Sequence, residues 1–249
     1  MPTVIDDADI IAVCNQSLGL LGAELITING TDQNHDLCTL YYPDAKDEML
    51  ICHPWNHAYK RANMLQAATP LNEYDYAFTK PTDCLRVLRI DNDPLCQFRV
   101  EGSLVLTNSY ESPDEYDDDS VDYLAGQYVS YSDVTYLVDT SFTSSDWATD
   151  LAAYLTTQTD DLKYVPVEYI YQAADIENFP AYLKQCVVYN LAIKLAPPIK
   201  ASEKAAMNLQ QMLYGGPQVT GYLNMARSLD AQESAVTEIK TQSWINSRY

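Results

Sequence analysis

The 249-residue chain has no apolar run close to the roughly 20 residues that a membrane-spanning helix needs. Its N-terminal stretch, Met1–Asp7, also lacks the basic and apolar blocks of a signal peptide. We therefore expect a protein that is made and used without membrane targeting, with no membrane among its partners. The hydrophobic fraction of 47% still suffices for a substantial core, in one large domain or two modest ones.

Cysteine pairs are also missing from the sequence. The six cysteines, at positions 14, 38, 52, 84, 96 and 186, are well separated, and no two of them form a C-x-x-C motif. Isolated thiols in apolar surroundings are typical of reduced core residues, so we expect no disulfide bonds.

Basic residues are scarce, and one quarter of the chain has none. The formal net charge is −20, and between Val100 and Leu162 there are fourteen acidic residues but no Lys or Arg. The rest of the chain is nearly conventional, with 21 acidic and 15 basic residues. Because an acidic surface repels phosphate backbones, we expect no specific nucleic-acid binding. The charge favours a protein partner or a face exposed to solvent.

Motifs for catalysis and metal binding are missing as well. There is no G-x-S-x-G nucleophile elbow, phosphate-binding loop or dinucleotide glycine fingerprint, so we predict no catalytic residues and no enzyme. His53 and His57 are four residues apart, but a proline lies between them and no H-E-x-x-H acid accompanies them, so we predict no metal site and no cofactor. The cluster Asp114–Asp122 could supply calcium ligands. It lacks the spacing of a D-x-D-x-D-G loop, which favours a solvated loop instead.

The sequence does contain a sharp change of pattern at His53-Pro54-Trp55. Proline has no backbone N–H to continue a helix and moves the preceding residue out of the α region, so a helix from about Asn34 must end before Pro54. A large aromatic ring directly after such a helix end favours a buried plug between two structural layers over a ligand-binding residue. We therefore predict a structural hinge formed by His53, Pro54 and Trp55.

Hydrophobic periodicity predicts helices in both terminal parts of the chain. The expected helices cover residues 6–21, 34–52, about 178–195, 202–214 and 218–233. Pro43 should kink or break the second of these helices, and Pro197 and Pro198 should end the third.

Between these helices the pattern changes to short runs bounded by Pro, Gly, Asp and Asn, which is typical of antiparallel strands. The expected strands lie at residues 74–78, 85–90, 97–100, 104–107, in one or two pieces within 127–138, and at 165–171. Glu101-Gly102-Ser103 should form a tight hairpin connection. Residues 111–119 should be a solvated loop, and Ser145-Asp146 should cap a short helix through Tyr154. The fold class predicted is α+β: a helical bundle from both chain ends with an inserted antiparallel β-rich domain.

Six short segments, in a fixed order and spacing, carry a resemblance to a known family. They are Cys14–Gly22, the helix with Tyr42, Asp44, Asp47 and Glu48, His53–Asn56, Pro81–Val87, Val167–Tyr171 and Leu191–Ala196. In these segments the chain resembles the tail tubular protein A family of tailed phages. Members of that family form adaptor rings beneath the portal of short-tailed viruses.

The resemblance implies a domain layout. A helical layer would comprise residues 1–54 and 176–233, a β-rich domain residues 55–175, and a C-terminal arm residues 234–249. Residues 56–67, whose periodicity is ambiguous, would be a strand. Residues 108–162 interrupt the family's plan, and their charge predicts a peripheral acidic lobe.

The resemblance also implies a function as a structural virion protein. The chain would form an adaptor ring, usually a dodecamer, that joins the portal protein to the tail nozzle protein at the head–tail junction after assembly in the host cytoplasm. DNA would pass through the ring without specific binding. The alternative that composition supports is an acidic protein-binding module whose insertion binds a basic partner or a cation.

The C-terminal arm contains the predicted interface residues. Trp244, Ile245, Arg248 and Tyr249 lie close together at the chain end. Trp, Tyr and Arg concentrate binding energy at interface centres, so the arm is expected to dock onto the portal or a neighbouring subunit.

Overall fold

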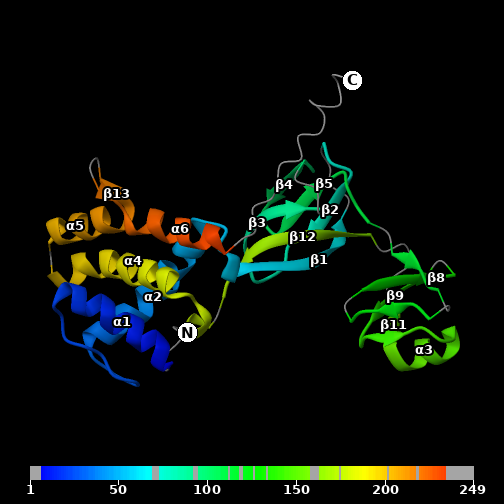
Figure 1. Cartoon of the computed structure of the whole chain (residues 1–249), viewed down its shortest axis with the longest axis horizontal. Helices are drawn as coiled ribbons and strands as arrows, with labels where there is room; N and C mark the ends of the chain where they lie inside the picture. Colours follow the sequence, from blue (N-terminus) through cyan, green and yellow to red (C-terminus); the bar gives the residue numbers. More distant parts are fainter. Residues whose placement is uncertain are drawn as a thin grey trace. The chain divides into compact units, whose positions relative to one another are not determined.

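The computed structural model is an α+β protein whose helices and sheets are drawn in Figure 1. It describes residues 7–68, 73–91, 95–111, 113–117, 120–125, 127–132, 134–157, 163–173, 175–200, 202–216 and 219–233. The chain divides into two compact units. We call Met1–Tyr59 with Gln172–Tyr249 the helical unit, and Lys60–Tyr171 the β unit.

The helical unit is organised around one long helix. Its helices are α1 (Ala8–Leu21), α2 (Gln33–Ile51), α4 (Ala181–Lys200), α5 (Glu203–Tyr214) and α6 (Tyr222–Gln232), with 3₁₀ turns η1 (Asn56–Ala58) and η2 (Ile176–Asn178) and a short hairpin of β13 (Gly215–Gly216) and β14 (Val219–Thr220). Helix α4 packs against α1, α2, α5 and α6. Leu183, Leu191 and Leu195 of α4 are completely buried. Its nearly continuous apolar surface is explained by these contacts on several sides.

Local sequence signals account for several helix ends. Asp7 caps α1 by accepting a hydrogen bond from the Asp9 N–H at 2.8 Å, and Gly22 ends that helix with a φ of 62°. Ser202 caps α5 through its hydroxyl. Helix α2 ends at Ile51, before Pro54, so the predicted helix end is confirmed.

Helix α4 continues through Pro197 and Pro198 to Lys200, so the prediction that these prolines end the helix is wrong. Pro43 does not break α2, which is a single helix, and the alternative that Pro43 kinks this helix stays a prediction. Each proline removes a backbone hydrogen bond, but Leu195 and Ala196 in the last turns of α4 are completely buried. Tertiary packing of these side chains outweighs the local preference.

Helix α6 begins at Tyr222, later than the predicted residue 218. Residues 219 and 220 instead pair with Gly216 and Gly215 as β14 and β13. The chain doubles back so tightly here that a Cβ on Gly221 would lie 2.2 Å from backbone atoms of Tyr214 and Gly215. Only glycine fits at this position.

The β unit contains a six-stranded sheet in the order β3-β12-β1-β2-β5-β4. Its strands are β1 (Tyr59–Ala68), β2 (Tyr76–Thr79), β3 (Cys84–Ile90), β4 (Phe98–Glu101), β5 (Leu104–Thr107) and β12 (Tyr164–Tyr171). The pairs β3–β12, β1–β2, β2–β5 and β4–β5 are antiparallel, as predicted. Gly102 adopts a φ of 60° in the predicted β4–β5 hairpin.

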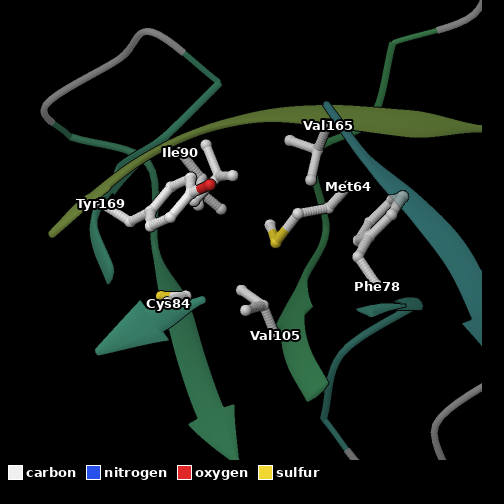
Figure 2. Packing of buried hydrophobic residues seen from close by; sticks show 8 residues of the cluster. Met64, Phe78, Cys84, Ile90, Val105, Val165 and Tyr169 are labelled. Atoms are coloured by element: carbon white, nitrogen blue, oxygen red, sulfur yellow. The ribbon is translucent and has the colours of Figure 1, made fainter. Parts of the chain in front are cut away.

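One apolar cluster forms the core of this sheet. Figure 2 shows Met64, Phe78, Val105 and Val165 converging from four different strands, with Tyr169 and Ile90 beside them. Each of these side chains is at most 1% exposed. The alternation of strand residues places them on one face of the sheet.

Residues between β5 and β12 form the acidic lobe, which has its own sheets. It contains β6 (Asp114–Glu115), β7 (Asp122–Tyr123), β8 (Tyr128–Tyr131), β9 (Val134–Val138), β10 (Phe142–Thr143), α3 (Trp147–Tyr154) and β11 (Leu155–Thr157). The strands make a four-stranded sheet, β11-β9-β8-β6, and a β10-β7 pair. The strands within 127–138 and the helix capped by Asp146 are confirmed. Unlike the other pairs described in the lobe, β6 and β8 are parallel.

The prediction of a solvated loop at 111–119 is wrong for the residues described there. Asp114–Glu115 form strand β6, and the Tyr116 side chain is only 7% exposed. Tyr116 packs in an apolar cluster with Tyr123, Val129, Val138 and Leu155. An aromatic ring within an acidic segment can bury enough apolar surface to order it.

Candidate functional site

Trp55 is the centre of the predicted hinge and is completely buried. Its indole Nε1–H donates a hydrogen bond to the Met49 carbonyl oxygen at 2.6 Å, so the ring is attached to the last turn of α2. The His53 ring meets the Trp55 ring edge-on, with centroids 4.6 Å apart. The predicted burial of Trp55 is confirmed, whereas its role as a hinge between two structural layers stays a prediction.

Asp230 of α6 connects the hinge residues to the last helix of the described chain. Its carboxylate is in a residue only 2% exposed. Oδ1 accepts hydrogen bonds from the Asn56 backbone N–H and the Tyr182 hydroxyl, both at 3.1 Å, and Oδ2 lies 3.1 Å from His53 Nε2. The Asn56 side-chain amide also donates to the Asp230 carbonyl oxygen at 2.8 Å. Asp230 therefore connects α6, α4 and the hinge turn.

Sequence reasoning missed Asp230, although a signal was present. Leu223, Ala226 and Asp230 lie on the buried side of α6, at helical spacing. An acid on the buried stripe of an amphipathic helix needs hydrogen-bond partners. Those partners come from segments far away in the sequence, so the pattern alone could not identify them.

The environment of His53 favours the neutral form of its imidazole beside this carboxylate. Burial lowers the pKa of His53 below its ordinary value, although Asp230 acts in the opposite direction. The neutral imidazole can donate through only one nitrogen. Because carboxylate oxygens accept hydrogen bonds, the contact with Asp230 selects the tautomer with hydrogen on Nε2.

The four predicted interface residues lie outside the described part of the chain. Trp244, Ile245, Arg248 and Tyr249 belong to residues 234–249, so their docking role stays a prediction. The last described residue, Glu233, directly follows α6.

The helical unit exposes two separate groups of large apolar side chains. The α1–α2 face comprises Leu20, Leu25, Ile28 and Leu40, and the α5–α6 face comprises Met207, Met212, Tyr214, Met225 and Leu229. Figure 1 shows α5 and α6 on one side of α4, with α1 and the α1–α2 connection on the other. Exposed large apolar side chains are frequent at protein–protein contacts.

The α5–α6 face is hollowed by a groove of about 570 Å³. Its lining includes Tyr189 of α4, Met212 of α5, and Tyr222 and Met225 of α6. The rings of Tyr189 and Tyr222 lie 5.8 Å apart. Methionine side chains adapt their shape easily, so such a groove can accept an apolar side chain of a partner.

A second, more polar cavity of about 290 Å³ lies where the acidic lobe meets strand β12. Glu111, Asp114 and Asp122 line it together with Tyr128 and Tyr164. Burial and neighbouring carboxylates raise the pKa of Glu111, and the same causes raise the pKa of Tyr164 to about 12. Burial is the larger cause of both shifts, and the neighbouring carboxylates act in the same direction.

The chain matches no protein-family model, and the comparison with curated proteins finds no relative. Among the described residues, none of the helices combines the length and apolar character required to cross a membrane.

Proposed function

We propose that the chain is a structural virion protein, an adaptor ring that joins the portal to the tail nozzle of a tailed phage. The observation that carries the proposal is the exposure of large apolar side chains both on α1, α2 and their connection and on α5 and α6. Figure 1 shows α5 and α6 on one side of α4, with α1 and the α1–α2 connection on the other. A contact between two different faces of identical subunits is heterologous, and it generates a closed ring when the rotation closes. The resemblance to adaptor proteins in the order of sequence motifs supports the same conclusion.

In this proposal the helices from both chain ends form a bundle that serves as the contact layer of the ring, most simply a dodecamer. The α1–α2 face of one subunit meets the α5–α6 face of the next. The ring is assembled in the host cytoplasm and becomes part of the virion at the head–tail junction. It performs no catalysis and needs no cofactor for assembly, and its acidic surface lets DNA pass without binding it specifically.

The C-terminal arm completes the contact between neighbouring subunits. Residues 234–249 follow directly after α6 and contain Lys240 and Arg248 but only one acid, Glu238. This segment is therefore net positive in a chain whose formal net charge is −20. The apolar groove favours docking of Trp244 on the α5–α6 face of a neighbouring copy, and the net negative charge of the whole chain favours association with a positively charged arm.

Substitutions that introduce one charge into either face test whether the ring forms through these two faces. Leu25→Glu and Met212→Glu each place a charge in one proposed face, and Leu124→Glu on the exposed surface of the acidic lobe is the matched control. Analytical ultracentrifugation, with and without the portal protein, should show rings for the wild type and the control only. An equimolar mixture of the two face variants should stop at small oligomers, because only one intact contact can form. A wild type that stays monomeric with its portal would refute the proposal.

Truncation after Gln242 tests the arm separately. We expect a folded protein whose assembly is weakened at least about tenfold, or 1.4 kcal/mol. Unchanged assembly would exclude the docking role. An unfolded product would show instead that Trp244 packs on its own subunit.

The carboxylate-lined cavity favours a second candidate function, an acidic module that binds a basic partner. Glu111, Asp114 and Asp122 converge there without a Lys or Arg among the lining residues. A lysine-rich peptide should then bind one per chain, with an affinity that falls as salt increases. Binding of this peptide to a chain that forms no ring would favour the module over the adaptor.

A further inference from the structure

Three metal-ligating side chains converge at the end of α6. They are His57 of η1, Asp230, and Glu233, which caps the helix. One possible ligand atom from each lies within 4.8 Å of those from the other two. His57 Nδ1 and Glu233 Oε2 are 3.7 Å apart. Asp230 and Glu233 are three residues apart, so the helix places them on the same side.

We propose that His57, Asp230 and Glu233 bind a divalent transition-metal ion of the Zn²⁺ class. One imidazole nitrogen and two carboxylate oxygens are ligands that Zn²⁺ accepts, with water at the remaining position. Calcium and magnesium prefer all-oxygen sites, so the imidazole favours zinc over either of them.

Asp230 is the fixed member of this triad. Its Oδ1 receives the Asn56 N–H and the Tyr182 hydroxyl, whereas the hydrogen bond described for Oδ2 comes from His53. A carboxylate oxygen has two lone pairs, so Oδ2 retains one for a metal ion. Hydrogen bonds that orient a ligating carboxylate are the usual support around a protein metal site.

His57 and Glu233 are the adjustable members. Their side chains are 38% and 44% exposed, so both can rotate to bring their donors to the roughly 2.0–2.2 Å that zinc requires. The nearby Arg227 guanidinium donates to the Cys52 carbonyl oxygen at 3.0 Å, where it does not occupy the triad. The two acids therefore provide negative charge for a cation.

Such an ion would join the turn before β1 to the point where α6 ends. His57 lies in η1, two residues before Tyr59, and Glu233 directly precedes residues 234–249. The site would act as a clip that holds two distant parts of the chain together. It goes beyond the proposed adaptor function and does not depend on it, because none of its residues belongs to the two apolar faces.

Metal titration of the intact chain tests the proposal. Metal-free protein is titrated with Zn²⁺ by calorimetry and with Co²⁺ by visible absorption, whose intensity reports the geometry of the bound ion. We expect one ion per chain and a higher thermal unfolding temperature with Zn²⁺ than without it. His57→Ala and Glu233→Gln should each weaken binding at least tenfold, whereas Glu177→Gln, which removes another exposed acid, should not.

Several outcomes would overturn the site. Zn²⁺ binding that is unchanged in His57→Ala would place the ion elsewhere, and binding of several weak ions would indicate only the general acidity of the surface. Equal binding of Ca²⁺ would contradict the preference for Zn²⁺ that an imidazole ligand should give. Circular dichroism of the metal-free variants controls for folding. His57 and Glu233 are both exposed, so the fold should tolerate both substitutions.

Discussion

Among the described residues, the six-stranded sheet and the acidic lobe each bury one carboxylate, but they stabilise it differently. In the sheet, Glu168 of β12 is 3% exposed. Arg61 Nε donates to its Oε1 at 2.9 Å, and Arg89 Nε donates to its Oε2 at 2.6 Å. Arg89 lies directly opposite Glu168 in the β3–β12 register. Opposite charges at such cross-strand positions stabilise a sheet.

In the acidic lobe, Asp150 of α3 is 2% exposed. It accepts hydrogen bonds from the Tyr116 hydroxyl at 2.5 Å, the Ser145 N–H at 2.8 Å and the Ser145 hydroxyl at 3.1 Å. The lobe has no Lys or Arg with which to form an ion pair. Neutral donors therefore satisfy the buried carboxylate but leave its charge uncompensated. The comparison shows that a lobe without cations can still bury an acid. We expect the stability of this lobe to be more sensitive to pH and salt than that of the sheet.

The largest effect is expected from removing the cations in the sheet. The double substitution Arg61→Met and Arg89→Met leaves Glu168 buried without its guanidinium partners, which should destabilise the sheet by about 3 kcal/mol. Urea unfolding measures the loss. Arg99→Met is the control, because its pair with Glu101 is exposed and such pairs contribute about 0–1 kcal/mol. A loss in the double variant no larger than the control's would show that Glu168 needs no cation.

Removing the acid in the lobe should have a somewhat smaller effect. Asp150→Ala leaves the Tyr116 hydroxyl and the Ser145 N–H without their acceptor, at a cost of about 2 kcal/mol. Hydrogen exchange followed by mass spectrometry should show faster exchange in peptides of the lobe only. Tyr116→Phe, which removes one donor, should cost less than Asp150→Ala. Equal acceleration in the six-stranded sheet would contradict the independence of the lobe core.

Acid should stabilise the lobe before it destabilises it. Burial and neighbouring carboxylates raise the pKa of Glu111 above its ordinary 4.5, so folding binds a proton and stability rises as the pH falls toward that value. Burial raises the pKa of Asp150, but the hydrogen bonds from Tyr116 and Ser145 lower it further, to below its ordinary 3.8. Stability from Asp150 is therefore lost as the pH falls below about 3.8.

Hydrogen exchange of lobe peptides across this pH range, corrected for intrinsic rates, measures the effect. Glu111→Gln should abolish the gain between pH 7 and 4.5 and leave the loss at lower pH. A steady decline from neutral pH in the wild type would contradict the expected maximum.

Salt should act with opposite signs in the two regions. Raising the salt concentration from 0.1 to 1 M shortens the screening length from about 10 Å to about 3 Å. Screening reduces repulsion in the lobe and weakens the Arg–Glu pairs of the sheet, each by less than about 1 kcal/mol. Comparing NaCl with an uncharged osmolyte separates screening from general effects on folding. A salt effect of the same sign on the stability of both regions would show that charge screening is not its cause.

Of all these changes, deletion of the lobe should have the smallest effect on the stability of the six-stranded sheet. Joining Ser109 to Leu162 removes residues 110–161 but none of the six strands of that sheet. The Lys163 carbonyl, just before β12, accepts a hydrogen bond from the Gln66 N–H of β1 at 3.1 Å. Gln66 pairs with Phe78 of β2, and Phe78 pairs with Val105 of β5, so β1 and β2 lie between β12 and β5. The new connection must therefore cross three strand spacings, or about 14 Å, which five extended residue steps can span.

We expect the deleted protein to retain its sheet and helical unit within about 1 kcal/mol in urea unfolding. A deletion with a scrambled sequence of the same length in place of the lobe controls for the strain of a short connection. Failure of both variants to fold would show that the lobe belongs to the core of the β unit.

Short-range signals in the sequence determined much of the fold. The helix end before Pro54, the hairpin at Gly102 and the short helix capped by Asp146 follow from neighbouring residues, and the structure has all three. Each depends on backbone geometry within a few residues. The α+β class follows from the same local patterns, whereas the adaptor function rests on resemblance and remains a proposal.

Tertiary structure decided the features that depend on distant residues. Packing carries α4 through Pro197 and Pro198, and it orders Tyr116 within a segment whose composition indicated a loop. It also brings Asp230 to a hinge 174 positions away in the sequence, and His57 to Glu233. No periodicity can indicate these contacts, because they arise only when separate elements bury their faces against one another.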